Sequence, residues 1–229
     1  MKSTKPFIEK YLKHLYSKIG LLLLLFLGAV FLFGVIIHEV LLENETQTDF
    51  IVFHFIAANM TTPELTSIMT VVTFFASSTF LQIAYPVLVL IYLAIKDFKR
   101  AIEISIIGVG GYLVNYAMKL FFHRPRPDHP LIEPLHNFSF PSGHAMSGFI
   151  FYGLLAYLVW KTKMKRGYKY LVSGLLIFFS LLIGFSRVYL RLHFSSDVAA
   201  GFCIGFAWVL LSIVIMERQK KISDAEMKG

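Results

Sequence analysis

The residues best suited to chemistry are basic side chains that lie where long apolar segments end. Lys119 and Arg126 follow one such segment, and Arg187 lies near the end of another. Guanidinium groups offer paired donors that match phosphate oxygens, and lysine adds a point charge. If the fold brings these three residues together, we expect a site for a multiply charged anion, above all phosphate.

The turn Pro141-Ser142-Gly143-His144 supplies hydrogen-bond donors of a second kind. Proline and serine are typical of the first positions of a helix, where backbone N–H groups are free and the helix dipole is positive. Gly143 permits close approach of an oxygen atom to the backbone. The turn therefore predicts an anion cradle at the start of a helix.

Two histidines are candidates for the reaction itself. Imidazole is the side chain best suited to nucleophilic and proton-transfer roles near neutral pH, and the candidates are His144 and His193. Asp197 lies four residues after His193, so the two share one face of a helical turn. A carboxylate against one ring nitrogen would leave the other nitrogen free to attack phosphorus. Arg124 and Arg191 are expected to contact lipid headgroups instead.

The elements that must position these residues are too apolar for a soluble protein. The chain has 229 residues, of which 56% are hydrophobic and 16% charged, whereas about a quarter of a soluble domain is charged. A helix of about 20 apolar residues crosses a membrane, so we predict an all-α integral membrane protein with six transmembrane helices. One or two short interfacial helices, at 50–56 and 63–77, are expected on the outer side. The predicted spans are residues 19–41, 79–96, 101–122, 143–160, 169–188 and 197–216.

The distribution of charge predicts the orientation in the membrane. Of the 22 Lys and Arg residues, 17 fall on one side of a six-span protein, within 1–18, 96–100, 161–169 and 217–229. Cytoplasmic loops collect basic residues, so we expect a plasma-membrane protein with both termini cytoplasmic and the anion site on the extracytoplasmic face. This topology also explains the net charge of +8, which therefore gives no reason to expect a nucleic-acid partner.

The same pattern divides the chain into three parts. We expect a basic cytoplasmic segment at 1–18, a six-span domain at 19–216 and a cytoplasmic tail at 217–229. The residues suited to chemistry all lie in the later part of the domain, about 100–216.

These residues form a pattern that resembles a known family. Lys119-(six residues)-Arg126-Pro127, then Pro141–His144, then Ser186-Arg187-(five residues)-His193-(three residues)-Asp197 is similar to the three-part signature of the type 2 phosphatidic acid phosphatase superfamily. The resemblance covers about residues 100–216. It is strongest to the small six-span bacterial members that act as phosphatidylglycerophosphatase B or as undecaprenyl diphosphate phosphatases.

The resemblance implies a mechanism and a set of site residues. His193 would attack the terminal phosphorus and be phosphorylated transiently while Asp197 holds it, and His144 would act as general acid. The family needs no metal or other cofactor, and the spacing of His123, His129 and His136 fits no familiar ligand motif. The residues implied to bind the phosphate are Lys119, Arg126, Ser142, Gly143 and Arg187.

The substrate is expected to be a lipid phosphate. Only 13 residues, Asp128 to Phe140, separate the first two parts of the signature, so no large outer domain covers the site. A lipid could then reach it laterally from the membrane, and no obligate protein partner is inferred. Phosphatidylglycerol phosphate is favoured, undecaprenyl diphosphate is a close second and phosphatidic acid a third. A non-catalytic phospholipid-binding or translocating membrane protein is the alternative from another class.

Overall fold

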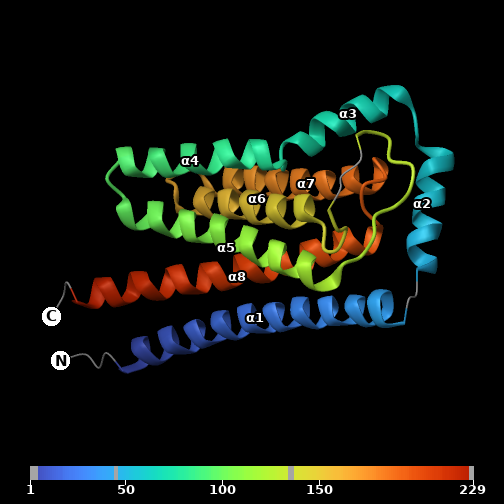
Figure 1. Cartoon of the computed structure of the whole chain (residues 1–229). Helices are drawn as coiled ribbons and strands as arrows, with labels where there is room; N and C mark the ends of the chain where they lie inside the picture. Colours follow the sequence, from blue (N-terminus) through green and yellow to red (C-terminus); the bar gives the residue numbers. More distant parts are fainter. Residues whose placement is uncertain (1–4, 44–45, 134–136, 227–229) are drawn as a thin grey trace.

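The regular structure that the computed structural model describes, over residues 5–43, 46–133 and 137–226, is entirely helical. Figure 1 shows long, roughly parallel helices with a shorter helix, α2, across one end. The predicted all-α membrane architecture is confirmed. The helices are α1 (Lys5–Ile37, continued by a π-helical turn at His38–Leu42), α2 (Gln47–Asn59), α3 (Pro63–Phe74), α4 (Ser78–Ala94), α5 (Phe98–Phe122), α6 (Gly143–Lys161), α7 (Arg166–Tyr189) and α8 (Ser195–Glu226).

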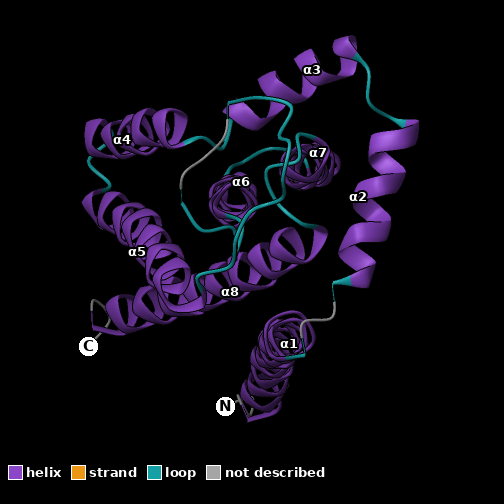
Figure 2. Cartoon of the chain, turned by 45° about the vertical axis from the view of Figure 1, so that its right-hand side comes forward, coloured by secondary structure: helices purple, strands orange, loops and turns teal. Residues whose placement is uncertain are grey.

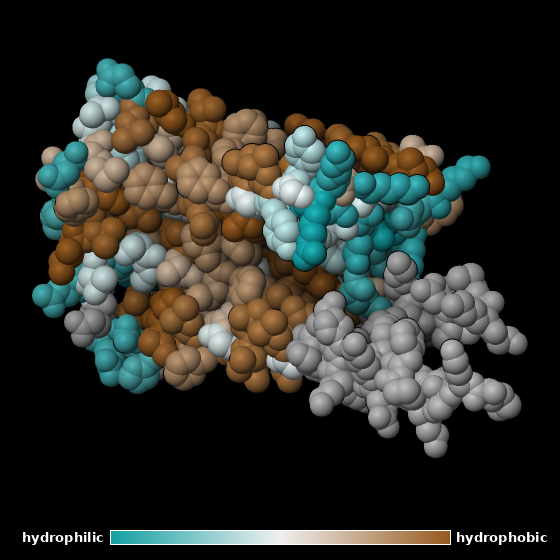
Figure 3. Space-filling view, turned by 180° about the vertical axis from the view of Figure 1, so that it is seen from behind, coloured by the Kyte–Doolittle hydropathy of each residue, from teal (hydrophilic) through white to brown (hydrophobic). Residues whose placement is uncertain are grey.

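Five helices in the described part of the chain are long and apolar enough to cross a membrane, and a bent pair brings the number to six. The first of these spans is Gly20–Val40, close to the predicted 19–41. α8 continues well beyond the predicted end of its span at 216, so no break separates it from the expected tail. Figure 3 shows the resulting apolar band, with hydrophilic residues gathered toward its ends.

The bent pair consists of α3 and α4, which meet at an angle of 41°. We predicted a short helix over residues 63–77 that lies at or dips into the membrane interface; α3 is a separate short helix in this region, and it buries Met69 and Val72 against its neighbours. The side chain of Ser77 accepts a hydrogen bond from the Phe80 N–H at 3.1 Å and so caps α4. The polar Ser77-Ser78 pair thus starts a new helix direction, and α3 and α4 meet the length and composition of a membrane span only as a pair.

α6 occupies the centre of the bundle (Figure 2). Its residues Ile150 and Leu154 are buried in one cluster with Ile104 of α5 and Val209 of α8. The first turn of α6 carries the Pro-Ser-Gly-His motif, so the most enclosed helix holds the predicted anion cradle in place. α1 lies at the periphery, where it packs against α8.

α2 covers the end of the bundle opposite the two termini (Figures 1 and 2). It includes the stretch 50–56 that we predicted to be interfacial. Its Ile56 is buried in a cluster with Tyr189, the last residue of α7, and with Leu190 and Leu192, which follow it. α2 is therefore packed onto the segment that carries the third part of the signature.

Candidate active site

The three parts of the sequence signature meet at the end of the bundle that α2 covers (Figure 1). Four of the residues sit in the first or last turn of a helix, where side chains can converge from several directions. Two others, Arg126 and His193, sit in the loops that follow α5 and α7. The four helix-end residues are Lys119 of α5, His144 of α6, Arg187 of α7 and Asp197 of α8.

His193 is buried and lies between a cation and a carboxylate. Its Nε2 atom is 3.1 Å from Nη1 of Arg126, and its Nδ1 atom is 3.4 Å from Oδ2 of Asp197. A guanidinium can only donate, so Nε2 accepts and the ring proton sits on Nδ1, facing Asp197. The Nδ1–Oδ2 distance exceeds the usual range for a hydrogen bond, so this contact is loose in the ligand-free structure.

This environment keeps the His193 ring neutral. Burial, followed by the charges of Arg187, Arg126 and Lys119, lowers the pKa of His193 well below its ordinary value of 6.5. At neutral pH the Nε2 lone pair is therefore free of a proton. A neutral imidazole with Nδ1–H held by a carboxylate is the form that can act as a nucleophile at Nε2.

Asp197 is completely buried, and its hydrogen bonds to other residues are shorter than its contact with His193. Its Oδ1 atom accepts a hydrogen bond from Nη1 of Arg124 at 2.6 Å, and its Oδ2 atom accepts one from the Phe194 N–H at 2.9 Å. Its backbone carbonyl accepts the N–H of Ser142 at 2.9 Å. The backbone of Asp197 thus links the second and third parts of the signature, and its side chain ties the third part to Arg124.

Arg124 is the site residue that sequence reasoning missed. We expected it to contact lipid headgroups, but only 7% of it is exposed, and it forms ion pairs with Asp197 and with Asp49 of α2. The expectation was wrong because the partner Asp49 is 75 residues away in sequence. One signal was available in the sequence. Arg124 lies between the signature residues Lys119 and Arg126, so it is close in the chain to residues expected to point into the site. Arg191 does remain near the surface, where its guanidinium lies 5.5 Å from the centre of the Phe53 ring.

Lys119 and Arg126 are held by backbone carbonyls of the loop between α5 and α6. Nζ of Lys119 donates to the Phe138 carbonyl at 2.6 Å. Arg126 donates to the carbonyls of Asn137 and Leu192, so it ties this loop to the loop that carries His193. Burial lowers the pKa of Arg126 to about 10, against the opposing effect of Asp197, so the guanidinium stays charged at neutral pH.

Arg187 has unused hydrogen-bonding capacity. Only 2% of it is exposed, and its Nη1 donates to Oγ1 of Thr73 on α3 at 2.8 Å. Its Nε and Nη2 atoms are buried without a hydrogen-bond partner among the described residues. A buried charged donor left unsatisfied is costly, and a phosphate can accept two parallel bonds from one guanidinium. Arg187 is therefore built to receive an anion.

The Pro-Ser-Gly-His turn forms the predicted helix start, since Ser142 is the N-cap of α6. A Cβ atom added to Gly143 would lie 3.1 Å from Oδ1 of Asn115 and 3.8 Å from Cε of Lys119. A Cβ atom added to Gly201 of α8 would lie 2.7 Å from the Ser142 carbonyl oxygen. The backbone at this turn is thus enclosed on two sides: a Cβ at Gly201 would press on the turn itself, and one at Gly143 would press on the Asn115 side chain.

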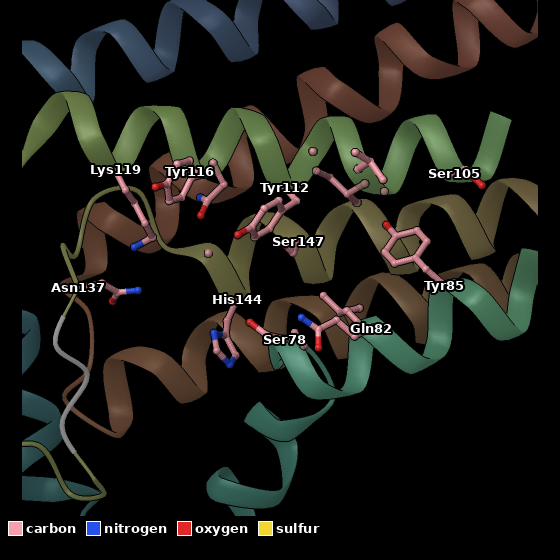
Figure 4. A pocket seen from close by; sticks show the side chains of 18 of the residues that line it. Ser78, Gln82, Tyr85, Ser105, Tyr112, Tyr116, Lys119, Asn137, His144 and Ser147 are labelled. Carbon is pink, nitrogen blue, oxygen red and sulfur yellow. The ribbon is translucent and has the colours of Figure 1, made fainter. Parts of the chain in front are cut away.

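A cavity of about 840 Å³ opens from these residues into the bundle. Lys119, Arg126, His144 and His193 line one end, and residues of α4 and α5 line the rest. Figure 4 shows the imidazole of His144 in this cavity, with Lys119 and Asn137 beyond it and Tyr85 and Ser105 farther along the helices. From Ser105 to Lys119 the cavity follows α5 for about 21 Å, given the rise of an α-helix.

A metal site was not predicted, and the described residues contain no group of three or more His, Cys, Asp or Glu side chains placed to hold a metal. His123 and His129 are exposed, and His136 lies outside the described residues. The donor set at the cavity end is cationic, so it is suited to an anion.

Comparison with known proteins gives one family match. The model of the PAP2 superfamily matches residues 101–221, which agrees with the part of the chain, about 100–216, that carries the signature. The chain is 30% identical over 209 residues to phosphatidylglycerophosphatase B of Bacillus subtilis (strain 168), covering 87% of this chain and 98% of that protein. It is 32% identical over 105 residues to undecaprenyl-diphosphatase BcrC of the same organism, covering 44% and 49%.

Two solved structures have a similar fold. One is the crystal structure of a transmembrane PAP2-type phosphatidylglycerolphosphate phosphatase from Bacillus subtilis, with a TM-score of 0.77 and 25% identity over 84% of this chain and 96% of that one. The other is the crystal structure of Aquifex aeolicus LpxE, with a TM-score of 0.56 and 25% identity over 70% of this chain and 92% of that one. The resemblance inferred from the three-part signature is confirmed.

Proposed function

The chain belongs to the PAP2 superfamily and is a membrane lipid phosphatase, and we propose that its substrate is phosphatidylglycerol phosphate. The products would be phosphatidylglycerol and inorganic phosphate. The similarity to phosphatidylglycerophosphatase B over nearly its whole length supports this substrate class.

The observation that carries the reaction chemistry is the combination of a neutral buried imidazole and an incompletely paired guanidinium. Nε2 of His193 carries a lone pair, and Nε and Nη2 of Arg187 lack partners among the described residues. The backbone N–H of His193 donates to the Arg187 carbonyl at 3.3 Å, and the charge of Arg187 is among those that lower the pKa of His193, so the two side chains lie near each other. A phosphate bound by Arg187 would therefore lie beside the nucleophile.

In the proposed first step, Nε2 of His193 attacks the terminal phosphorus, and the bond from phosphorus to the lipid oxygen breaks. His144, in the same cavity and protonated in the substrate complex, donates its proton to that oxygen, which leaves as the lipid alcohol. The Nδ1–H group stays directed at Asp197, which stabilises the positive charge that develops on the ring. Charge on the transferred phosphoryl group is balanced by Lys119, Arg126, Arg187, the Ser142 hydroxyl and the N–H group of Gly143.

In the second step, water attacks the phosphohistidine and the P–N bond breaks. His144, now neutral, accepts a proton from this water, so both histidines return to their starting states. Every proton and electron pair is accounted for by the two imidazoles and the substrate. The mechanism we propose therefore assigns no step to a metal or another cofactor.

The lipid would enter from the side. The cavity extends along α5 for about two thirds of the thickness of a hydrocarbon core, and α4 and α5 expose large apolar side chains such as Leu90 and Val109. Acyl chains could occupy this part while the phosphate remains at the cationic end. We propose that this end faces the extracytoplasmic side and that the basic segments 1–18 and 217–229, which flank the six-span domain 19–216, are cytoplasmic.

Undecaprenyl diphosphate is the second candidate substrate. The observation that favours it is the 32% identity to undecaprenyl-diphosphatase BcrC, although this similarity spans about half of each chain. Its terminal phosphate would use the same cationic end, and a single long isoprenoid would replace the acyl chains in the cavity.

The test is phosphate release by the purified full-length protein in detergent, with chelator present. The substrates are phosphatidylglycerol phosphate, undecaprenyl diphosphate and phosphatidic acid. We expect the fastest release from phosphatidylglycerol phosphate, and no release by His193→Asn. His129→Asn is the matched control, because His129 is exposed and its φ of 53° is a conformation that Asn tolerates. Lipid binding without release of phosphate from any substrate would instead indicate a binding or translocating protein.

The proposed topology is tested by labelling single cysteines with a membrane-impermeant maleimide in a Cys203→Ala background. A cysteine at His129 should be labelled in intact cells, and a cysteine at Lys163 only after permeabilisation. The opposite pattern would place the catalytic end in the cytoplasm.

A further inference from the structure

The carboxylate that holds His193 belongs to a larger buried group of charges. Arg124 bridges two carboxylates, with Nη1 at 2.6 Å from Oδ1 of Asp197 and Nη2 at 2.8 Å from Oδ2 of Asp49. The guanidinium also lies 4.4 Å from the centre of the Phe194 ring. All three charged side chains are at most 7% exposed, so their charges interact with little screening by water.

Asp49 is bound on several sides at once. Its Oδ1 accepts the Ser195 hydroxyl at 2.6 Å and the Ser196 N–H at 2.9 Å. Its Oδ2 accepts the Ser196 hydroxyl at 2.5 Å in addition to Arg124. The residue lies in the first turn of α2 and satisfies donors at the first turn of α8. α2 is thereby fixed to the helix that carries Asp197.

The charge balance of this group matters for His193. A single guanidinium paired only with Asp197 would neutralise that carboxylate and compete with the imidazole for it. With Asp49 as a second partner, one positive charge is shared between two carboxylates, so a net negative charge remains beside Nδ1–H of His193. The two carboxylate oxygens of Asp197 have different partners: Oδ1 accepts a hydrogen bond from Arg124, and Oδ2 faces His193.

We propose that Asp49 and Arg124 are positioning residues of the phosphatase site, which keep Asp197 oriented and negatively charged opposite Nδ1–H of His193. α2 thus contributes to catalysis although none of its side chains lines the cavity. This inference rests on the proposed role of His193 as the nucleophile. Neither residue contacts the phosphate, so their loss should affect the chemical step and leave substrate binding largely unchanged.

The experiment measures kcat and KM on the best substrate of the panel for Asp49→Asn, Arg124→Gln, Arg124→Lys and the double variant Asp49→Asn/Arg124→Gln. We expect kcat to fall about tenfold for Asp49→Asn, because its amide NH₂ would face the donors of Arg124 and Ser196, with KM within about twofold of wild type. Arg124→Gln should lower kcat about a hundredfold, and Arg124→Lys should restore part of the loss because it keeps the charge. The double variant should be no worse than Arg124→Gln, since Asp49 acts through Arg124.

The matched control is Ile56→Ala, which loosens the packing of α2 and leaves every charge of the group in place. Its kcat should stay within about twofold of wild type. Equal losses of kcat for Ile56→Ala and Asp49→Asn would overturn the inference, because α2 attachment alone would then be responsible. Multiplicative effects in the double variant, or a change confined to KM, would also overturn it.

Two other outcomes of the experiment are also informative. If Asp49→Asn does not fold, the comparison of Arg124→Lys with Arg124→Gln decides the question, and equal activity of these two would contradict a role for the charge. If wild type releases no phosphate, the proposed function has failed. An active wild type with unaffected Asp49 and Arg124 variants means that only the present inference has failed.

Discussion

Gly201 offers a direct test of how closely the anion cradle must be placed. It lies on α8, one turn after Asp197, and faces the Pro-Ser-Gly-His turn. In Gly201→Ala the new Cβ would lie 2.7 Å from the backbone oxygen of Ser142, whereas ordinary contact begins at 3.4 Å. The turn or α8 must therefore move by about 0.7 Å. Misplacement of catalytic groups by about 1 Å can cost a factor of about 100 in rate, so we expect kcat to fall by roughly ten- to a hundredfold.

The assay is steady-state phosphate release, accompanied by the affinity for orthovanadate, which mimics the five-coordinate phosphorus. Both should fall in Gly201→Ala, because the cradle is displaced from the phosphate position. Gly174→Ala is the control, since a Cβ at Gly174 of α7 meets nothing within 4 Å, and it should behave as wild type. A folded Gly201→Ala protein with unchanged kcat and vanadate affinity would refute the close fit that we infer between α8 and this turn.

Three further predictions concern the phosphate site. Thr73→Val removes the hydroxyl that anchors Arg187, so KM should rise several-fold while kcat changes less, as steady-state kinetics would show. Orthovanadate should inhibit wild type in the presence of chelator; inhibition that needs added metal would contradict the metal-free site. The third prediction concerns stability. The pKa of His193 in the folded chain lies well below 6.5, so below that pH the unfolded chain binds a proton that the folded chain does not. The contribution of His193 to the free energy of unfolding is therefore full above about pH 6.5 and falls on acidification. Denaturant unfolding in micelles should therefore show a free energy of unfolding that falls between about pH 7.5 and 5, and His193→Gln should flatten this dependence; an equal slope in this variant would show that His193 is not responsible.

The fold and the position of most candidate site residues at the ends of helices could be predicted because a membrane makes strong demands on sequence. A span must be apolar along its whole length, so the ends of spans and the charges near them are visible in the chain. Lys119 and Arg187 are conspicuous because they stand where such segments end. The turn before α6 is recognisable because helix starts require particular residues. The roles of these residues in the reaction stay predictions.

What could not be predicted depends on contacts between segments distant in sequence. Asp49 is a single acid in a short amphiphilic stretch, and no spacing rule relates it to Arg124 or to Ser196. The bend between α3 and α4 was expected near Ser77-Ser78, but the packing of α3 against α7 depends on burial that the apolar pattern does not specify. Thr73 is likewise an ordinary helix residue until Arg187 is placed against it.

Five basic residues lie apart from the 17 that the predicted topology places on the cytoplasmic side, and the structure gives each a local reason. Lys119 and Arg126 line one end of the cavity, and Arg187 lies near His193, whose pKa the charges of all three residues lower. Arg124 differs, because two buried carboxylates bind it, and Arg191 lies against an aromatic ring. The positive charge that is uncompensated within the site is thus concentrated on the three residues positioned to bind a phosphate. A dianionic phosphate would offset that charge, so binding should be electrostatic at the headgroup and apolar along α4 and α5. The same division explains why a lipid phosphate suits the cavity better than a small soluble phosphate does: the soluble ester would satisfy the cationic end and leave the remaining apolar length unfilled.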